Sequence, residues 1–173
     1  MLNQTAVLDG FTIRGGNANY TGSDPLIQKN GGGMLNISAS PVIRNCVFTA
    51  NTTTYNGGGV FNEDAQPLIT GCTFSVNNAS VKGGGVFNTG YMNWKITNCR
   101  FIANTNGGVY NMGMLDVVNT EFSRNTGTGF ENGQQGVEPA YAKLVNCSFS
   151  LNGSSVLNNY SDIEIFNSIS DKS

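Results

Sequence analysis

The sequence contains no histidine and few charged residues of either sign. Asp, Glu, Lys and Arg make up 12% of the 173 residues, against roughly a quarter in an average domain. The absence of histidine removes the commonest general base and metal ligand. A net charge of −2 and a pI near 4.9 provide no basic surface for nucleic acid. We therefore expect no nucleic-acid partner, no metal and no cofactor.

Long apolar runs are also missing. No stretch approaches the roughly 20 apolar residues that a helix needs to cross a bilayer, and none carries a sustained 3.6-residue apolar period. The 23 glycines recur too often for stable helices. We therefore expect neither membrane insertion nor helical structure.

What the chain has in abundance is a repeated segment. Residues 57–77, GGGVFNEDAQPLITGCTFSVN, are followed by a second copy at 83–104, GGGVFNTGYMNWKITNCRFIAN. One asparagine closes the Gly-rich half of each repeat, at Asn36, Asn62, Asn88, Asn111, Asn132 and Asn158. One phenylalanine recurs further on, at Phe48, Phe74, Phe101, Phe122 and Phe149. Periods of this length are typical of solenoids.

Each repeat is interpreted as three short strands, at 58–62, 67–70 and 72–75 in the clearest copy. Because the partner of each strand lies one repeat away, the strands must pair in parallel. We predict an all-β fold, a right-handed parallel β-helix of about six or seven coils of three short strands. The hand follows from the strong bias of parallel crossovers.

Residues 1–173 are predicted to form a single β-helix domain, with corner insertions near 17–30 and 133–141. We expect the domain to be a fragment of a longer solenoid. A cut between coils exposes unpaired strand edges, so we expect self-association through the N-terminal end.

Alternation along the strands predicts which side chains face inward. One inward row is aliphatic: Leu8, Ile43, Ile69, Ile96, Val117 and Leu144. A second holds Cys46, Cys72, Cys99, Thr120 and Cys147. Stacked cysteines that point the same way have poor disulfide geometry, so we predict four free thiols. A polar row is expected at corners, with positive φ and stacked amides, at Asn51, Asn77, Asn104, Asn125 and Asn152.

The segments FTAN, FSVN, FIAN, FSRN and FSLN, each preceded by a GG-aliphatic element, resemble the repeats of chlamydial polymorphic outer membrane proteins. More broadly, they are similar to right-handed parallel β-helix repeats of the pectate-lyase-like superfamily. The resemblance covers roughly residues 6–159, although the family's GG-Ala-aliphatic appears here as GGGM, GGGV, GGGV and GGV. It implies a non-catalytic module of a secreted or cell-surface bacterial protein, used for adhesion or for binding carbohydrate or a partner.

The same superfamily contains polysaccharide lyases and hydrolases, so a polysaccharide-active enzyme, or a fragment of one, is the alternative. Such enzymes need carboxylates clustered on neighbouring coils. No row supplies them here, since Glu121 lies between Arg100 and Ser148. Glu63 and Asp64 are interpreted as a solvated corner. We therefore name no catalytic residue.

The candidate binding site is a row in the first strand of each repeat. Because the neighbouring row that contains Val60 and Val86 is apolar and faces inward, the row beside it is predicted to face outward. It reads Leu35, Phe61, Phe87, Tyr110, Glu131 and Leu157. Three aromatic rings on successive coils would form an exposed stripe for a glycan or another protein surface. The alternatives are that a corner loop such as 17–30 covers the stripe, or that the rings belong to the core.

Overall fold

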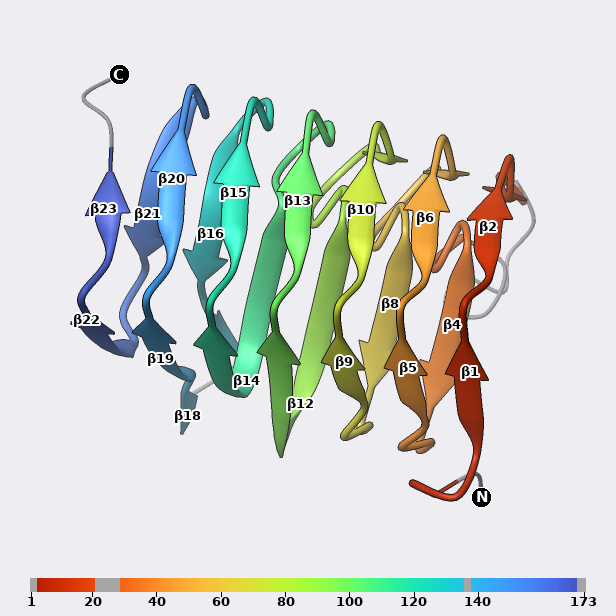
Figure 1. Ribbon diagram of the computed structural model, residues 1–173, viewed down its shortest axis with the longest axis horizontal. Helices are drawn as coiled ribbons and strands as arrows, with labels where there is room; N and C mark the ends of the chain where they lie inside the picture. The colour runs from red at the N-terminus through yellow and green to blue at the C-terminus, as the bar shows by residue number, and fades with distance from the viewer. Residues whose placement is uncertain (1–2, 21–28, 136–137, 171–173) are drawn as a thin grey trace.

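The computed structural model describes residues 3–20, 29–135 and 138–170 (Figure 1). Strands dominate this part of the chain, and it contains no helix long and apolar enough to cross a membrane. Equivalent strands of successive repeats lie side by side, and they pair in parallel. The all-β prediction is confirmed, and the curled parallel sheets are consistent with a β-solenoid.

The largest sheet consists of two rows of strands, because β12 and β14 run through both rows. The first row contains β4 (Met34–Ile37), β8 (Val60–Glu63), β12 (Val86–Thr97), β14 (Val109–Val118), β16 (Thr128–Asn132) and β21 (Ser154–Asn158). The second row contains β1 (Val7–Asp9), β5 (Val42–Arg44), β9 (Leu68–Thr70), β12, β14, β19 (Tyr141–Val145) and β22 (Asp162–Phe166).

The next sheet along the chain follows a kink after each strand of the second row. It contains β2 (Thr12–Arg14), β6 (Val47–Thr49), β10 (Thr73–Ser75), β13 (Arg100–Ile102), β15 (Glu121–Ser123), β20 (Ser148–Ser150) and β23 (Ile169–Ser170). A small third sheet was not predicted; it contains β3 (Asn17–Ala18), β7 (Thr52–Thr53) and β11 (Asn78–Ala79).

The two predicted corner insertions differ in how much of them is described. Within 17–30, residues 17–20 include β3, whereas 21–28 lie outside the described residues. Within 133–141, β17 (Gln134–Gln135) and β18 (Glu138–Pro139) form an antiparallel pair.

The strand register confirms the start of the predicted aliphatic row and aligns the first repeat with the next. Leu8 lies beside Ile43, and Ile13 lies beside Phe48. The sequence alone left the end of the chain without a register, and the structure supplies it. Ile165 of β22 lies beside Leu144, so the aliphatic row continues to the last repeat.

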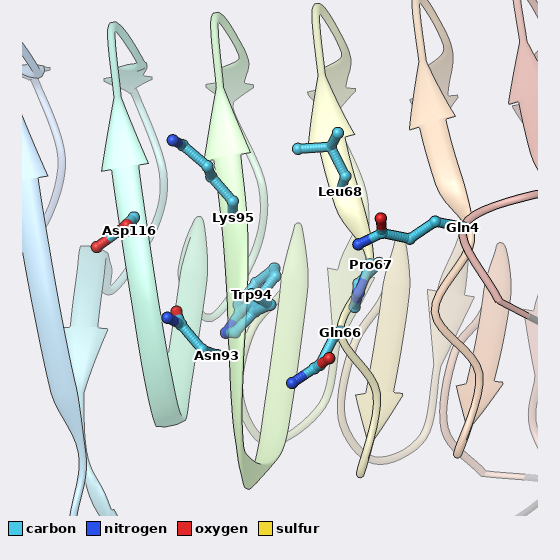
Figure 2. Close-up of a pocket in the computed structure, with 8 residues that line it drawn as sticks. All are labelled: Gln4, Gln66, Pro67, Leu68, Asn93, Trp94, Lys95 and Asp116. Carbon is cyan, nitrogen blue, oxygen red and sulfur yellow. The ribbon is translucent and has the colours of Figure 1, made fainter.

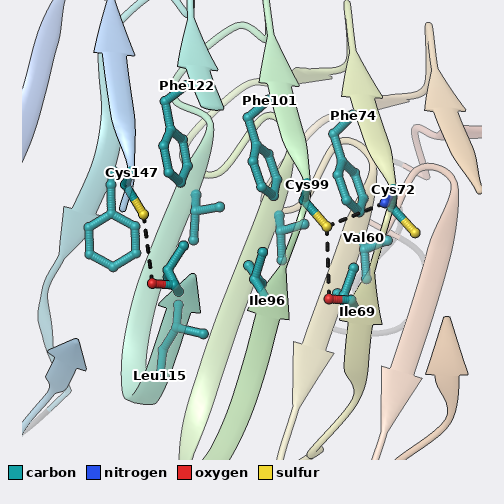
Figure 3. Close-up of a cluster of buried hydrophobic side chains, with 14 of the residues drawn as sticks. Val60, Ile69, Cys72, Phe74, Ile96, Cys99, Phe101, Leu115, Phe122 and Cys147 are labelled. Carbon is teal, nitrogen blue, oxygen red and sulfur yellow. Dashed lines mark hydrogen bonds between the residues drawn. The ribbon is translucent and has the colours of Figure 1, made fainter. Parts of the chain in front are cut away.

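The core consists of rows of identical or similar side chains stacked along the long axis (Figure 3). Phe74 and Phe101 stack with 4.7 Å between their ring centroids and an interplanar angle of 3°. Ile69 and Ile96 are completely buried beside them. One repeat alone has no partner for such a face, so burial depends on the neighbouring repeats.

The glycine before each first strand is required by close approach of the backbone. A Cβ on Gly85 would lie 2.4 Å from the carbonyl oxygen of Gly108 and 2.7 Å from Cδ1 of Phe101. Because real Cβ contacts are longer than this, any side chain at Gly85 would push two repeats apart.

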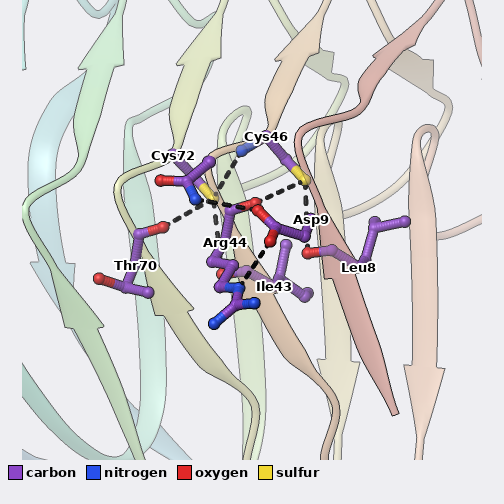
Figure 4. A network of polar contacts seen from close by, with 8 residues as sticks. Leu8, Asp9, Ile43, Arg44, Cys46, Thr70 and Cys72 are labelled. Carbon is purple, nitrogen blue, oxygen red and sulfur yellow. Dashed lines mark hydrogen bonds and ion pairs between the residues drawn. The ribbon is translucent and has the colours of Figure 1, made fainter.

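The four cysteines are free and buried, as predicted. Each thiol donates to a nearby carbonyl, as Cys46 Sγ does to the oxygen of Arg44 at 3.1 Å (Figure 4). Burial raises the pKa of the Cys147 thiol. A side-chain hydrogen bond with Cys72, together with burial, raises the pKa of Cys99. These thiols behave as small buried apolar groups.

The corner asparagines stack as predicted, but the expected positive φ is not theirs. Asn77 donates from Nδ2 to Oδ1 of Asn104 at 3.0 Å, and Asn104 donates in the same way to Asn125. Positive φ falls instead on the residue before each asparagine, for example Val76 at 56° and Ala103 at 52°. The prediction was wrong on this point because the amide is buried and holds the turn by hydrogen bonds, while the residue before it bends the backbone.

Candidate functional site

The predicted aromatic row exists and its rings stack. The ring centroids of Phe61 and Phe87 are 5.3 Å apart, and those of Phe87 and Tyr110 are 5.1 Å apart. Val60 and Val86, which precede these phenylalanines on the same strands, pack in the main hydrophobic core, whereas Phe61 and Phe87 do not belong to it. The rings therefore lie on the side of the sheet that the sequence predicted.

The prediction that this row is exposed was wrong for Phe61 and Phe87, which are 3% and 6% exposed. The segment that leads into each strand turns back over it. A Cβ on Gly57 would lie 2.8 Å from Cβ of Phe61, and one on Gly83 would lie 3.0 Å from Cα of Phe87. The returning corners therefore cover the row, and the two phenylalanine rings offer no free face to a ligand.

The other two predicted residues lie where the covering corners become shorter. Glu131, expected to be exposed, is only 6% exposed, because Lys82 binds it. Lys82 Nζ lies 2.8 Å from both Oε1 and Oε2 of Glu131 and 5.2 Å from the centroid of the Tyr110 ring. Asn159 Nδ2 donates to Oε1 at 3.1 Å.

Tyr110 remains half-buried in this cluster. Burial, and then the negative charge of Glu131, raise the pKa of Tyr110, so its hydroxyl stays protonated at neutral pH. A cavity of about 80 Å³ opens beside the ion pair, lined by Val81, Lys82, Asn106, Gly127, Thr128 and Glu131. We call this cavity and the Lys82–Tyr110–Glu131–Asn159 cluster the Lys82 notch.

A larger groove lies at the kink between the second row of strands and the next sheet. Its volume is about 440 Å³, and it is lined by Asn98, Cys99, Arg100, Asn119, Thr120, Glu121, Asn146 and Ser148. We call it the amide groove because three exposed asparagines run along it. Asn119 Nδ2 donates to Oδ1 of Asn98 at 3.2 Å, and Asn146 Nδ2 donates to Oδ1 of Asn119 at 3.1 Å.

The backbone explains why asparagine occupies these positions. Asn98, Asn119 and Asn146 have φ of 54°, 51° and 53°, in the left-handed region that asparagine tolerates. Gly71 takes the equivalent place in an earlier repeat, with φ of 62°. Each amide in the row has two N–H donors and an acceptor oxygen, so the row keeps hydrogen-bonding capacity for a ligand after its internal bonds are made.

A charged pair flanks the amide groove. Arg100 Nε donates to Oε2 of Glu121 at 2.9 Å, and Ser123 donates to Oε1 at 2.8 Å. The hydrogen bond from Arg100 keeps the pKa of Glu121 below its ordinary value, so the carboxylate is charged at neutral pH. The groove therefore presents amides along one row, and guanidinium, carboxylate and hydroxyl groups along the row beside it.

The amide groove was not predicted from the sequence, although the sequence carries a signal for it. Each of its asparagines directly precedes a residue of the inward cysteine row, as Asn98 precedes Cys99. A polar residue repeated at one kink position, next to an inward residue, places equal side chains on one line of the surface. The row of asparagines could be seen in the sequence, whereas the hydrogen bonds between them and the groove that they line could not.

A third hollow, of about 240 Å³, lies at the start of the second row of strands (Figure 2). It is lined by Gln4, Gln66, Pro67, Leu68, Asn93, Trp94, Lys95 and Asp116. Trp94 is 2% exposed, and its Nε1 donates to Oδ1 of Asn111 at 3.2 Å. The ring therefore belongs to the core, and the hollow presents the carboxamides and the charges of Lys95 and Asp116.

Within the described ranges, no group of three or more His, Cys, Asp or Glu side chains is placed to hold a metal ion. Glu63 and Asp64 are at a corner, with Glu63 half-buried and Asp64 exposed at φ 47°. No protein-family model, no curated protein and no solved structure matches this chain.

Proposed function

We propose that the protein is a non-catalytic recognition segment that binds a carbohydrate chain along the amide groove. The observation that carries the proposal is the row of exposed amides of Asn98, Asn119 and Asn146, each one repeat from the next. Parallel strands are spaced about 4.8 Å apart, so the groove offers equal polar groups at a regular step. A polyhydroxylated chain parallel to the long axis would meet a donor and an acceptor at every step.

The flanking groups support the same ligand class. Arg100 uses Nε for Glu121 and keeps its two terminal nitrogens for a ligand, while Ser148 adds a hydroxyl. The hollow at Lys95 and Asp116 lies on β12 and β14, the two strands that lead into the kink at Asn98 and Asn119, so polar groups continue from the groove along these strands. Polar groups at fixed positions give specificity to binding sites of this kind.

The wider context of the proposal rests on the repeats. We propose that the strands wind as a right-handed parallel β-helix of the pectate-lyase-like kind, and that the protein acts in a secreted or cell-surface bacterial setting. The five FxxN segments and the GG-aliphatic elements support this. In such a setting, binding of a surface glycan in the amide groove would serve adhesion.

The test is affinity electrophoresis of the protein through gels that contain single polysaccharides of neutral, acidic and amino-sugar types. The protein is expected to be retarded by at least one of them. The variant Asn119→Gly with Asn146→Gly removes two amides without backbone strain, because glycine already occupies the equivalent position at Gly71. That variant should lose at least tenfold in affinity.

Asn45→Gly is the matched control, since Asn45 lies at the same kink position, with φ of 53°, outside the groove. It should bind as the unchanged protein does. If no polysaccharide retards the protein, or if the groove variant and the control bind equally, the proposal is wrong.

A further inference from the structure

The Lys82 notch lies where the corner segments that cover the aromatic row become shorter from one repeat to the next. Corner residues 52–57 and 78–83 are long and include β7 and β11. The corners of the next two repeats, residues 105–107 and 126–127, are shorter and contain no named strand. Lys82 is on the last long corner, whereas Tyr110 and Glu131 belong to the repeats beyond it.

The two halves of the notch have different character. Glu131 is 7% exposed in its side chain and is fixed on β16, with Tyr110 on β14 and Asn159 after β21. Lys82 is 41% exposed and reaches across 49 residues of sequence from a corner. The anionic half is therefore a fixed surface, and the cation approaches it from the solvent side on a flexible chain.

The chemistry of the fixed half selects a primary ammonium group. Both carboxylate oxygens of Glu131 accept from one nitrogen at 2.8 Å, which suits an ammonium because it has three donors at one point. The Tyr110 ring lies 5.2 Å from the same nitrogen, within the range of cation–π attraction. The adjoining cavity of about 80 Å³ leaves room beside the bound group.

We propose that Glu131, Tyr110 and Asn159 form a binding site for a primary ammonium group, which Lys82 fills in the free protein. The ammonium group of a bound ligand takes the place of Lys82. The exchange keeps the number of ion pairs in the notch unchanged, so Lys82 acts as an internal competitor. This site goes beyond the carbohydrate groove and shares no residue with it.

The test empties the site and refills it with a small probe. In Lys82→Ala, n-butylammonium chloride should raise the thermal midpoint in a concentration-dependent way, by about 2–4 °C near saturation. The unchanged protein should gain at least tenfold less stabilisation at the same concentration, because Lys82 holds the site. Sodium chloride at equal ionic strength and n-butanol should give no specific shift.

Lys82→Ala with Glu131→Gln is the matched control, because it removes both charges and leaves no unpaired carboxylate. It should fold and show no response to n-butylammonium. If Lys82→Ala alone is unfolded, n-butylammonium should restore its folded signal whereas sodium chloride should not. Equal responses of the single and double variants, or no response of the single variant, would overturn the proposal.

Discussion

The row of buried corner asparagines predicts a large loss of stability on removal of a single amide. Asn104 is completely buried. Its Nδ2 donates to the carbonyl of Phe74 and to Oδ1 of Asn125, each at 3.0 Å. Its Oδ1 accepts from the backbone N–H and from Nδ2 of Asn77, also at 3.0 Å. Asn104→Ala deletes four hydrogen bonds that join three successive repeats.

The magnitude follows from the groups that the substitution leaves behind. Asn77 Nδ2 keeps its bond to the carbonyl of Phe48, and Asn125 Oδ1 keeps the backbone N–H of Asn104. The N–H of Asn77 loses its partner, whereas the carbonyl of Phe74 keeps its place in the parallel ladder between β10 and β13. A buried polar group left unpaired costs about 1–3 kcal/mol, so the orphaned N–H alone gives a loss of about 1–3 kcal/mol. This is a sizeable part of the 5–15 kcal/mol that is typical of a whole domain.

Urea unfolding followed by far-ultraviolet circular dichroism measures the effect. Asn78→Ala is the control, because Asn78 is an exposed asparagine one residue from the same row. We expect the control to change the free energy of unfolding by less than about 0.5 kcal/mol, as surface substitutions usually do. If Asn104→Ala costs less than about 1 kcal/mol, water or rearranged amides satisfy the orphaned N–H and the reasoning fails.

Two further predictions concern the cysteines and the aromatic row. Thiol titration in denaturant without reductant should find about four thiols per chain, and a count near zero would mean disulfides. In the folded state the thiols should react slowly, because those of Cys99 and Cys147 are buried and have raised pKa values. Phe61→Ala with Phe87→Ala should lower the free energy of unfolding by at least about 3 kcal/mol, since both rings are buried; an unchanged thermal midpoint would show that the covering corners do not seal the row.

The strand register could be predicted from the sequence because the repeats are in phase. Leu8 beside Ile43 and Ile13 beside Phe48 follow from matching apolar columns. A shift of one residue would turn every buried side chain to the outside, so the pattern strongly restricts the register. The same logic placed Phe61 and Phe87 on the outer side of their strands, where the structure has them.

The exposure of those rings could not be predicted, because it depends on what the corners do after they leave the sheet. Alternation along a strand says which way a side chain points, and it does not say whether another segment lies over it. The corners at 52–57 and 78–83 are mostly polar, with residues such as Thr52, Asn56 and Asn78, and had no sustained apolar pattern to indicate a second layer. Only the repeated glycines at 57 and 83 marked the turn.

The Lys82–Glu131 pair shows a second limit of row-by-row reasoning. Comparison of neighbouring repeats places Glu131 beside Tyr110 and Leu157, neither of which carries a charge that could pair with it. Its partner comes from a corner two repeats earlier, and the contact exists because the corners between them are shorter than the one that carries Lys82. A single carboxylate in an otherwise apolar row requires a cation nearby once it is buried. The row therefore indicates that Glu131 needs a partner, and the change in corner length determines which lysine can reach it.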